Sequence, residues 1–268
     1  MKFLSSAGFF KQQRGGCRVF VRADLGQDLS NALYGMLNDR LRLVREGRER
    51  DVLELGERAV LAKTAVFRHR NSRIRATFGL KRHGAYDRGV MEIHNQLGLL
   101  NCPHVPQIVG YGYRRNWLGL VVSTTLATEF IDQSCNLLEF IQAHPEQQNA
   151  VLLLAFNAIR EHLSHSHLHL DLWAGNILVT PDLSRSWLVD VEYFKFAPNG
   201  SLEDKLGFCL GYLHNHTIHR FISLDDYVQL VRQWLKDSEQ ALCHESTLAT
   251  CIQNANKPLS RKQRLMTF

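Results

Sequence analysis

Polar side chains with a fixed spacing follow one another in the segment HLHLDLWAGNILV and in the segment WLVDVE after it. Asn176 stands five residues after Asp171, and Asp190 stands fourteen residues after Asn176. A carboxylate can orient a hydroxyl and take its proton, and amide and carboxylate oxygens are hard ligands of the kind that Mg²⁺ requires. The apolar runs 177–179 and 187–189 predict short strands that would hold these ligands in place. The pattern therefore predicts phosphoryl transfer from ATP, with Asp171 at the acceptor hydroxyl and Asn176 and Asp190 on Mg²⁺.

His169 completes a wider motif around Asp171. The loop reads HxDLxxxN from His169 to Asn176, and the next element supplies a metal-binding aspartate, Asp190. In these residues the sequence resembles the protein-kinase-like superfamily. The resemblance implies a two-lobed α+β fold, in which a small antiparallel sheet plus a helix is followed by a helical lobe. It also implies ATP and Mg²⁺ as cofactors in the cleft between the lobes, with His169 bracing the catalytic loop.

The resemblance extends to the segment VREGRERDVLEL, which has the layout of the family's phosphate-covering loop. It implies that Gly47 stands at the central glycine and Val52 at the valine that closes over the base. Arg45 and Arg50 stand where the family has its other two glycines. The backbone of this loop therefore cannot approach the phosphates as closely, although the two arginine side chains could contact them.

A lysine eleven residues after Val52 has the position of the family's phosphate-binding lysine. This residue is Lys63 in VLAK, and its implied helix partner is Glu92, which stands eleven residues before Pro103. Lys81, at the end of an alternating run, is the alternative for the same role. We favour Lys63, because it follows the loop as the second strand of a hairpin should.

Within the superfamily, the chain is most similar to two small bacterial branches: lipopolysaccharide core kinases and the kinase-like family of the PhoP regulatory network. The short GRERDV loop, the compact VLAK hairpin and DVE in place of DFG carry this similarity. An APE-like activation segment, with which protein kinases dock peptides, does not follow Asp190. The resemblance therefore implies a sugar or other small-molecule acceptor, such as the lipopolysaccharide core. The alternatives are a kinase-like regulator that binds nucleotide without transfer, which the degenerate glycine loop favours, and a protein kinase.

The predicted elements divide the chain into a sheet part and a helical part. Residues 1–40 contain one predicted helix and are interpreted as an extension, residues 41–130 as the N-terminal lobe, and residues 131–268 as the helical lobe with the catalytic loop. The periodicity of apolar residues predicts strands at 41–44, 51–55, 59–67, 107–113 and 117–126, and helices at 90–100, 136–142, 145–166, 202–216 and 225–238.

Residues 68–88 are predicted to be a basic insertion in the N-terminal lobe. They contain seven Lys or Arg and a single acid, Asp87. Since a solvated face usually mixes charges of both signs, we expect this segment to contact an anionic partner. That partner would be a sugar or glycolipid acceptor or the anionic membrane surface that carries it. Nucleic acid binding would rest on charge alone and is not favoured.

The overall composition is that of a globular protein, with 45% hydrophobic and 22% charged residues and a formal net charge of +6. The six cysteines are scattered without a CxxC pair, which argues against a disulfide framework or a zinc site and fits a reducing compartment. The sequence lacks a recognisable secretory signal and a membrane span, so we expect a cytoplasmic location, with peripheral contact at the inner membrane.

A string of four histidines precedes Asp171: His162, His165, His167 and His169. The string has the look of a metal cluster. However, no cysteine or acidic ligand completes the set, so a metal site is not predicted here.

Overall fold

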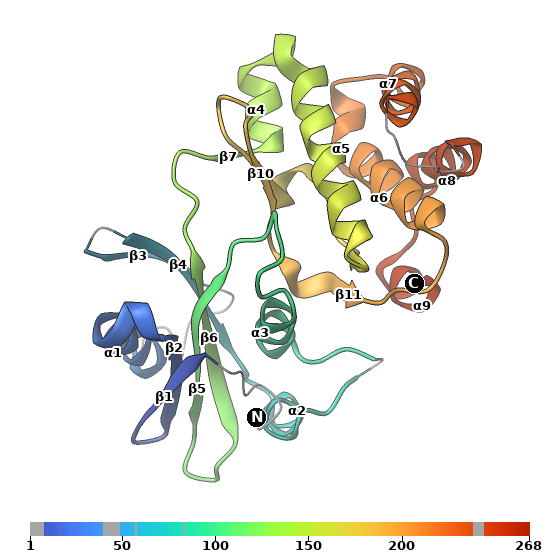
Figure 1. Ribbon diagram of the computed structural model, residues 1–268. Coiled ribbons are helices and arrows are strands. Elements are labelled where there is room, and N and C mark those ends of the chain that lie inside the picture. Colours follow the sequence, from blue (N-terminus) through green and yellow to red (C-terminus); the bar gives the residue numbers. More distant parts are fainter. Residues whose placement is uncertain (1–7, 40–48, 57, 83, 238–243) are drawn as a thin grey trace. The chain divides into compact units, whose positions relative to one another are not determined.

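The chain forms two compact units. The structure is a computed structural model that describes residues 8–39, 49–56, 58–82, 84–237 and 244–268 (Figure 1). The first unit contains residues 1–101 and 106–131, and the second contains residues 102–105 and 132–268. The main change of unit follows Ile131.

The first unit is built on a six-stranded antiparallel sheet with the strand order β1-β2-β5-β6-β4-β3. Alternating side chains explain the strands, because successive residues of a strand point to opposite faces of the sheet. Buried Val19 and Val21 thus alternate with Phe20 in β2. The strands are β1 (Phe9–Arg14), β2 (Cys17–Arg22), β3 (Glu49–Leu55), β4 (Arg58–Val66), β5 (Ile108–Arg115) and β6 (Val121–Glu129).

Three helices cover the two faces of this sheet (Figure 1). Helix α1 (Gly26–Asn38) packs Leu29, Leu33 and Leu37 into one buried cluster. Helices α2 (Arg70–Phe78) and α3 (Arg88–Gly98) contribute to a separate cluster. The sheet therefore has a hydrophobic core on each side, which makes it a firm support for the side chains of β4 and α3.

The interpretation of residues 1–40 as an extension does not fit the structure. Strand β2 pairs with β5, and α1 packs on the sheet, so both belong to the first unit. The signal was present in the sequence: Gly15–Gly16 separates two runs of strand-forming residues, which is typical of a hairpin. The strand predicted at 41–44 lies outside the described residues.

The second unit is mainly helical. Its helices are α4 (Leu137–Ala143), α5 (Gln148–Ser164), α6 (Leu202–His216), α7 (Leu224–Lys236), α8 (His244–Asn256) and α9 (Arg261–Thr267). Helices α6 and α8 pack closely, because Gly207 and Gly211 have no side chain at the contact. A Cβ atom at either position would collide with the backbone of α8. Large buried side chains such as Phe156 and Tyr227 fill the core between the helices.

Two small antiparallel sheets in the second unit hold the segment that contains Asp171, Asn176 and Asp190. One has the order β10-β9-β7 and the other pairs β11 with β8. Their strands are β7 (Cys135–Asn136), β8 (His167–His169), β9 (Ile177–Val179), β10 (Ser186–Leu188) and β11 (Phe194–Phe196). The predicted α+β class, with an antiparallel sheet and helix followed by a helical part, is confirmed. Among the described residues, every helix is too short or too polar to cross a membrane.

Candidate active site

His169 fixes the start of the loop that carries Asp171. The backbone amide of Asp171 donates to Nδ1 of His169 at 3.2 Å, and Nε2 of the same ring lies 3.0 Å from the carbonyl oxygen of Val189. A carbonyl can only accept, so Nε2 carries the proton and Nδ1 is the acceptor. Burial lowers the pKa of His169, which keeps the ring neutral in this arrangement. The histidine therefore joins the loop to the strand that precedes Asp190.

Asn176 and Asp190 are placed by the pairing of β9 with β10. Ile177 pairs with Leu188, and one residue further the amide of Val189 donates to the carbonyl oxygen of Asn176 at 2.9 Å. Asp190 follows directly, in a left-handed conformation with φ of 59° that aspartate tolerates better than most residues. Register thus brings together the two residues that the sequence predicted as metal ligands.

The Asn176 side chain also ties this junction to Asp171. Its Nδ2 donates to the carbonyl oxygen of Asp171 at 2.9 Å, and the side chain is buried. With the amide nitrogen used in this way, Oδ1 is the atom of Asn176 that is suited to a cation. Asn176 and the Asp190 carboxylate thus provide hard oxygen donors of the kind that fit Mg²⁺.

The Asp171 carboxylate lies between a tyrosine and an arginine. Tyr212 of α6 donates its hydroxyl to Oδ1 at 2.6 Å, and Nη1 of Arg264 in α9 lies 3.0 Å from the same oxygen. Burial opposes ionisation of this carboxyl, but the hydrogen bonds from Tyr212 and Arg264 outweigh it and hold the pKa of Asp171 below its ordinary value. Asp171 is therefore ionised at neutral pH.

Arg264 is the main residue of this site that the sequence analysis missed. It is buried, donates to the carbonyl of Leu170, and stacks its guanidinium 4.5 Å from the ring centroid of Tyr212. The sequence does contain a signal for the start of α9, because Ser260 and Gln263 form a capping box. It contains no signal for the contact itself, since Arg264 and Asp171 are 93 residues apart.

In the first unit, Lys63 and Glu92 form a buried ion pair. Nζ of Lys63 in β4 lies 2.8 Å from Oε1 of Glu92 in α3, and the two side chains are 10% and 4% exposed. The alternative lysine, Lys81, is exposed and lies 4.9 Å from the ring centroid of Tyr86. The pairing that the sequence predicted is therefore the one present in the structure.

The other predicted nucleotide contacts are only partly described. Val52 lies in β3, where it pairs with Leu61 of β4 and is 49% exposed. Arg50 pairs with Lys63 in the same ladder. Gly47 and Arg45 lie outside the described residues.

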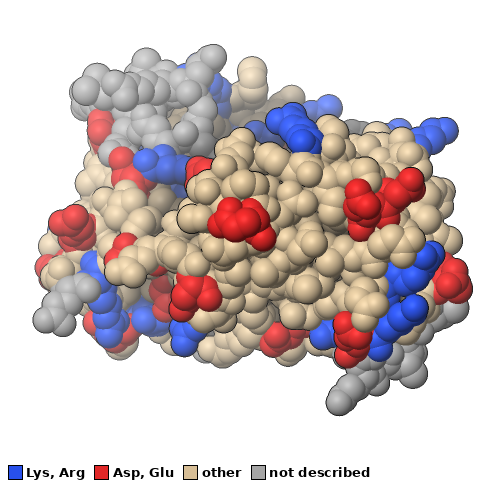
Figure 2. Space-filling model, turned by 90° about the horizontal axis from the view of Figure 1, so that it is seen from above, with Lys and Arg blue, Asp and Glu red and all other residues tan. Residues whose placement is uncertain are grey.

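The basic segment 68–88 contains helix α2. Some of its positive charges are already bound by groups of the protein itself. Arg75 makes two hydrogen bonds to Asp87, at 2.9 and 3.0 Å, and Nε of Arg73 donates to the carbonyl oxygen of Phe67 at 2.7 Å. On the face shown in Figure 2, acidic and basic groups are both scattered among uncharged side chains. The net charge of +6 is therefore not gathered on that face.

Comparison with known proteins gives no matching family model and no matching curated protein. Among solved structures, the chain is similar to WaaP in complex with acyl carrier protein, with 16% identity, 89% of this chain and 94% of that chain covered, and a TM-score of 0.49. It is also similar to two structures of WbdD, one of them described as a bifunctional kinase-methyltransferase, with 15% and 14% identity and TM-scores of 0.47 and 0.46. These matches cover 85% and 82% of this chain but 46% and 47% of the WbdD chains, so this chain spans about half their length.

Proposed function

We propose that this protein is an ATP-dependent kinase that transfers the γ-phosphate to a hydroxyl of a sugar or other small-molecule acceptor. The observation that carries the proposal is the β9–β10 junction. There the amide of Val189 bonds to the carbonyl oxygen of Asn176, and Asp190 is the next residue after Val189. Two hard oxygen donors on fixed backbone suit Mg²⁺. The bond from the Asn176 amide to the carbonyl of Asp171 links the same junction to a carboxylate that could meet the acceptor.

Each residue has one proposed role. Asn176 and Asp190 would hold Mg²⁺, and Lys63, held in place by Glu92, would bind the α- and β-phosphates. Bound Mg²⁺ and ATP supply the phosphoryl group and the neutralisation of its charge. Asp171 orients the acceptor hydroxyl and accepts its proton.

The surroundings of Asp171 favour orientation over strong basicity. Because Tyr212 and Arg264 hold the pKa of its carboxyl below the ordinary value, Asp171 is a weak base that stays ionised. Phosphoryl transfer relies mainly on positioning and on stabilisation of charge, so a carboxylate fixed by two donors suits this chemistry.

We propose that the acceptor is a sugar of an anionic glycolipid, and that the protein also contacts the membrane surface that carries this glycolipid. The lipopolysaccharide core is the example that the sequence resemblance implies. Exposed side chains of segment 68–88 support this assignment. Phe78 is 67% and Leu80 is 49% exposed, close in sequence to the exposed cations Arg70, Lys81 and Arg82. Apolar side chains beside cations are typical of surfaces that bind the interface of an anionic bilayer.

Two substitutions at the site test the division of roles. Asp171→Asn should lower phosphate transfer by about 10²- to 10⁴-fold and leave ATP affinity unchanged, because its proposed partner is the acceptor. Asp190→Asn should weaken ATP binding in Mg²⁺, because it removes a charged metal ligand. Transfer is measured with γ-labelled ATP and a panel of sugars, glycolipids and proteins, and ATP affinity by calorimetry.

Asp182→Asn, in the exposed turn between β9 and β10, is the matched control and should change neither quantity. Normal transfer by both site variants would show that the catalytic loop is wrongly assigned. If the wild-type protein binds ATP in Mg²⁺ but labels none of the acceptors, the kinase proposal fails in favour of a nucleotide-binding regulator. Label in the protein fraction alone would instead indicate a protein kinase.

A further inference from the structure

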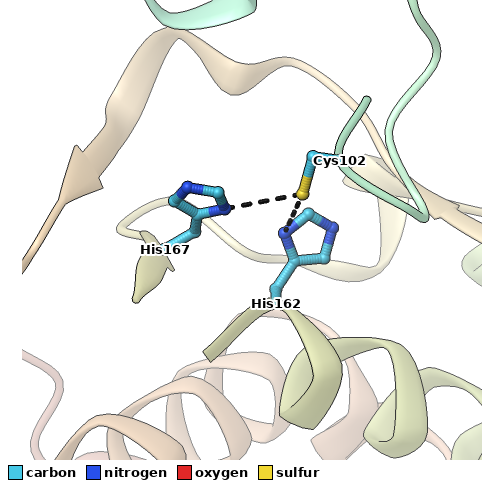
Figure 3. A group of neighbouring side chains, drawn as sticks. All are labelled: Cys102, His162 and His167. Carbon is cyan, nitrogen blue, oxygen red and sulfur yellow. Dashed lines mark hydrogen bonds between the residues drawn. The ribbon is translucent and has the colours of Figure 1, made fainter. Parts of the chain in front are cut away.

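Cys102, His162 and His167 meet in the second unit. Figure 3 shows both imidazole rings directing a nitrogen toward the sulfur of Cys102. Nδ1 of His167 lies 3.5 Å and Nδ1 of His162 lies 3.8 Å from Sγ. One ligand atom from each residue lies within 4.8 Å of the other two. A thiolate and two imidazoles are a ligand set that Zn²⁺ accepts.

The distances match those that a shared ion requires. A tetrahedral Zn²⁺ with bonds of about 2.3 Å to sulfur and about 2.05 Å to nitrogen separates the two ligand atoms by about 3.6 Å. The observed separations of 3.5 and 3.8 Å lie on either side of that value. Both sulfur–nitrogen distances therefore suit one shared ion.

The tautomer of His162 is also the one that ligation needs. Its Nε2 lies 3.4 Å from the carbonyl oxygen of His104, so Nε2 is the donor and Nδ1 presents its lone pair toward Cys102. A carbonyl behind the distal nitrogen is the usual support of a metal-binding histidine. Burial lowers the pKa of His162 to about 3, and burial also lowers the pKa of His167. Both rings are thus neutral at pH 7, as ligands must be.

We propose that Cys102, His162 and His167 bind one Zn²⁺ ion, with a fourth position left for water. On binding, the sulfur gives its proton to solvent and forms the bond to the metal as a thiolate. His162 is buried and His167 is only half-buried, so the ion enters from the side of His167.

The ion would fasten a short segment to the second unit. Residues 102–105 belong to that unit, although the residues on both sides of them in the sequence belong to the first. His104 in this segment already binds the carbonyl oxygen of Ser186 at 2.7 Å and the carboxylate of Glu161 at 2.8 Å. A bond from Cys102 to an ion held by α5 and β8 would add a stronger attachment at the start of the segment.

Metal binding by the full-length protein tests the proposal. The protein is treated with a chelator, dialysed into excess Mg²⁺ and titrated first with Co²⁺ and then with Zn²⁺. We expect one Co²⁺ per chain, a thiolate-to-cobalt charge-transfer absorption, and displacement of Co²⁺ by Zn²⁺. Excess Mg²⁺ should not compete, because it prefers oxygen ligands.

Substitutions locate the ligands, with controls chosen from the same neighbourhood. Cys102→Ser and His167→Gln should each weaken Zn²⁺ binding by about 100-fold or more. Cys135→Ser and His165→Gln replace a cysteine and a histidine outside the group and should bind Zn²⁺ like the wild type. Circular dichroism confirms that each variant is folded.

A measurement on the unaltered chain makes the result independent of folding defects. Zn²⁺ should slow the alkylation of Cys102 by iodoacetamide and leave that of Cys135 unchanged, as read by mass spectrometry. Absence of the charge-transfer absorption together with equal alkylation of Cys102 with and without Zn²⁺ would overturn the proposal. In that case the three side chains form only sulfur–nitrogen hydrogen bonds. Zn²⁺ binding that is abolished by Mg²⁺, or is equal in Cys102→Ser, His167→Gln and the wild type, would also overturn it.

Discussion

The two units each contain an ion pair at a residue of the proposed site, but the two pairs differ in origin and in burial. Lys63 and Glu92 are 10% and 4% exposed, and both belong to the motif that the sequence revealed. Asp171 is 34% exposed, and its partner Arg264 comes from α9, outside any motif. The first pair is thus buried on both sides of the contact. The second pair holds the carboxylate that is proposed to meet the acceptor, and Arg264 can be changed without changing that carboxylate.

Of the substitutions that test this comparison, the one that breaks the buried pair should have the largest effect. Lys63→Met should lower phosphate transfer by about 10²-fold, because it removes a cation proposed to stabilise the transferring phosphate. It should also lower the free energy of unfolding by about 3 kcal/mol, because the Glu92 carboxylate is left buried beside an apolar group. Transfer is measured with γ-labelled ATP, and stability by urea denaturation.

A double substitution separates these two effects. Lys63→Met with Glu92→Leu removes both charges, so it should recover most of the stability but none of the activity. Lys81→Met is the matched control, because Lys81 is exposed and lies over the Tyr86 ring, outside the buried pair. A large loss of transfer with Lys81→Met and a small one with Lys63→Met would reverse the assignment of the phosphate-binding lysine.

The second pair should give a smaller effect that depends on pH. Arg264→Gln should lower the free energy of unfolding at neutral pH by about 2 kcal/mol, the usual contribution of a hydrogen bond between charged groups. The Asp171 pKa is lowered in the folded state, so its contribution is present above the ordinary value of 3.8 and disappears as the pH falls below it. The difference in stability between wild type and variant should therefore shrink in acid.

The pKa of Asp171, measured by NMR, directly tests whether Arg264 stabilises the ionised carboxylate. It should rise in Arg264→Gln and stay unchanged in Lys262→Gln, an exposed cation two residues away on the same helix. Transfer by Arg264→Gln should fall about tenfold, since Asp171 keeps its bond from Tyr212 but loses half of its support. An unchanged pKa would show that Tyr212 alone controls the carboxylate.

The contrast between the pairs also explains what the sequence could and could not predict. His169, Asn176 and Asp190 meet through short strands whose apolar pattern is visible, and Lys63 and Glu92 lie on a strand and a helix of strong periodicity. These placements follow from patterns of apolar residues within short segments of the sequence. Contacts such as Arg264 with Asp171 depend on how distant helices pack, and no periodicity encodes that.

The same limit explains the cysteine and histidine group. The sequence analysis found no cysteine to complete the histidine string, yet Cys102 reaches His162 across 60 residues. The first 40 residues are a different case. Local patterns favour their hairpin and helix, but these residues contain no chemical motif that would link them to the sheet.

A third ion pair, Arg75 with Asp87, extends the comparison to the basic segment. Its side chains are 21% and 19% exposed, so it resembles a structural pair more than a surface for ligands. Arg70 and Arg82, by contrast, are exposed and lie on either side of the exposed Phe78 in the sequence. The seven cations that looked equivalent in the sequence therefore fall into different classes.

The smallest expected effect distinguishes these classes. Arg70→Gln or Arg82→Gln should each weaken binding to phosphatidylserine vesicles by about fivefold, since one cation near an anionic surface contributes about 1 kcal/mol. Arg75→Gln should lower the melting temperature, because Asp87 loses its partner, but should change vesicle binding less than either. The differences should fade in high salt, which screens exposed charges beyond a few ångströms. Equal vesicle binding by wild type, Arg70→Gln and Arg82→Gln at low salt would exclude this segment as the membrane contact and leave its cations a solubilising role.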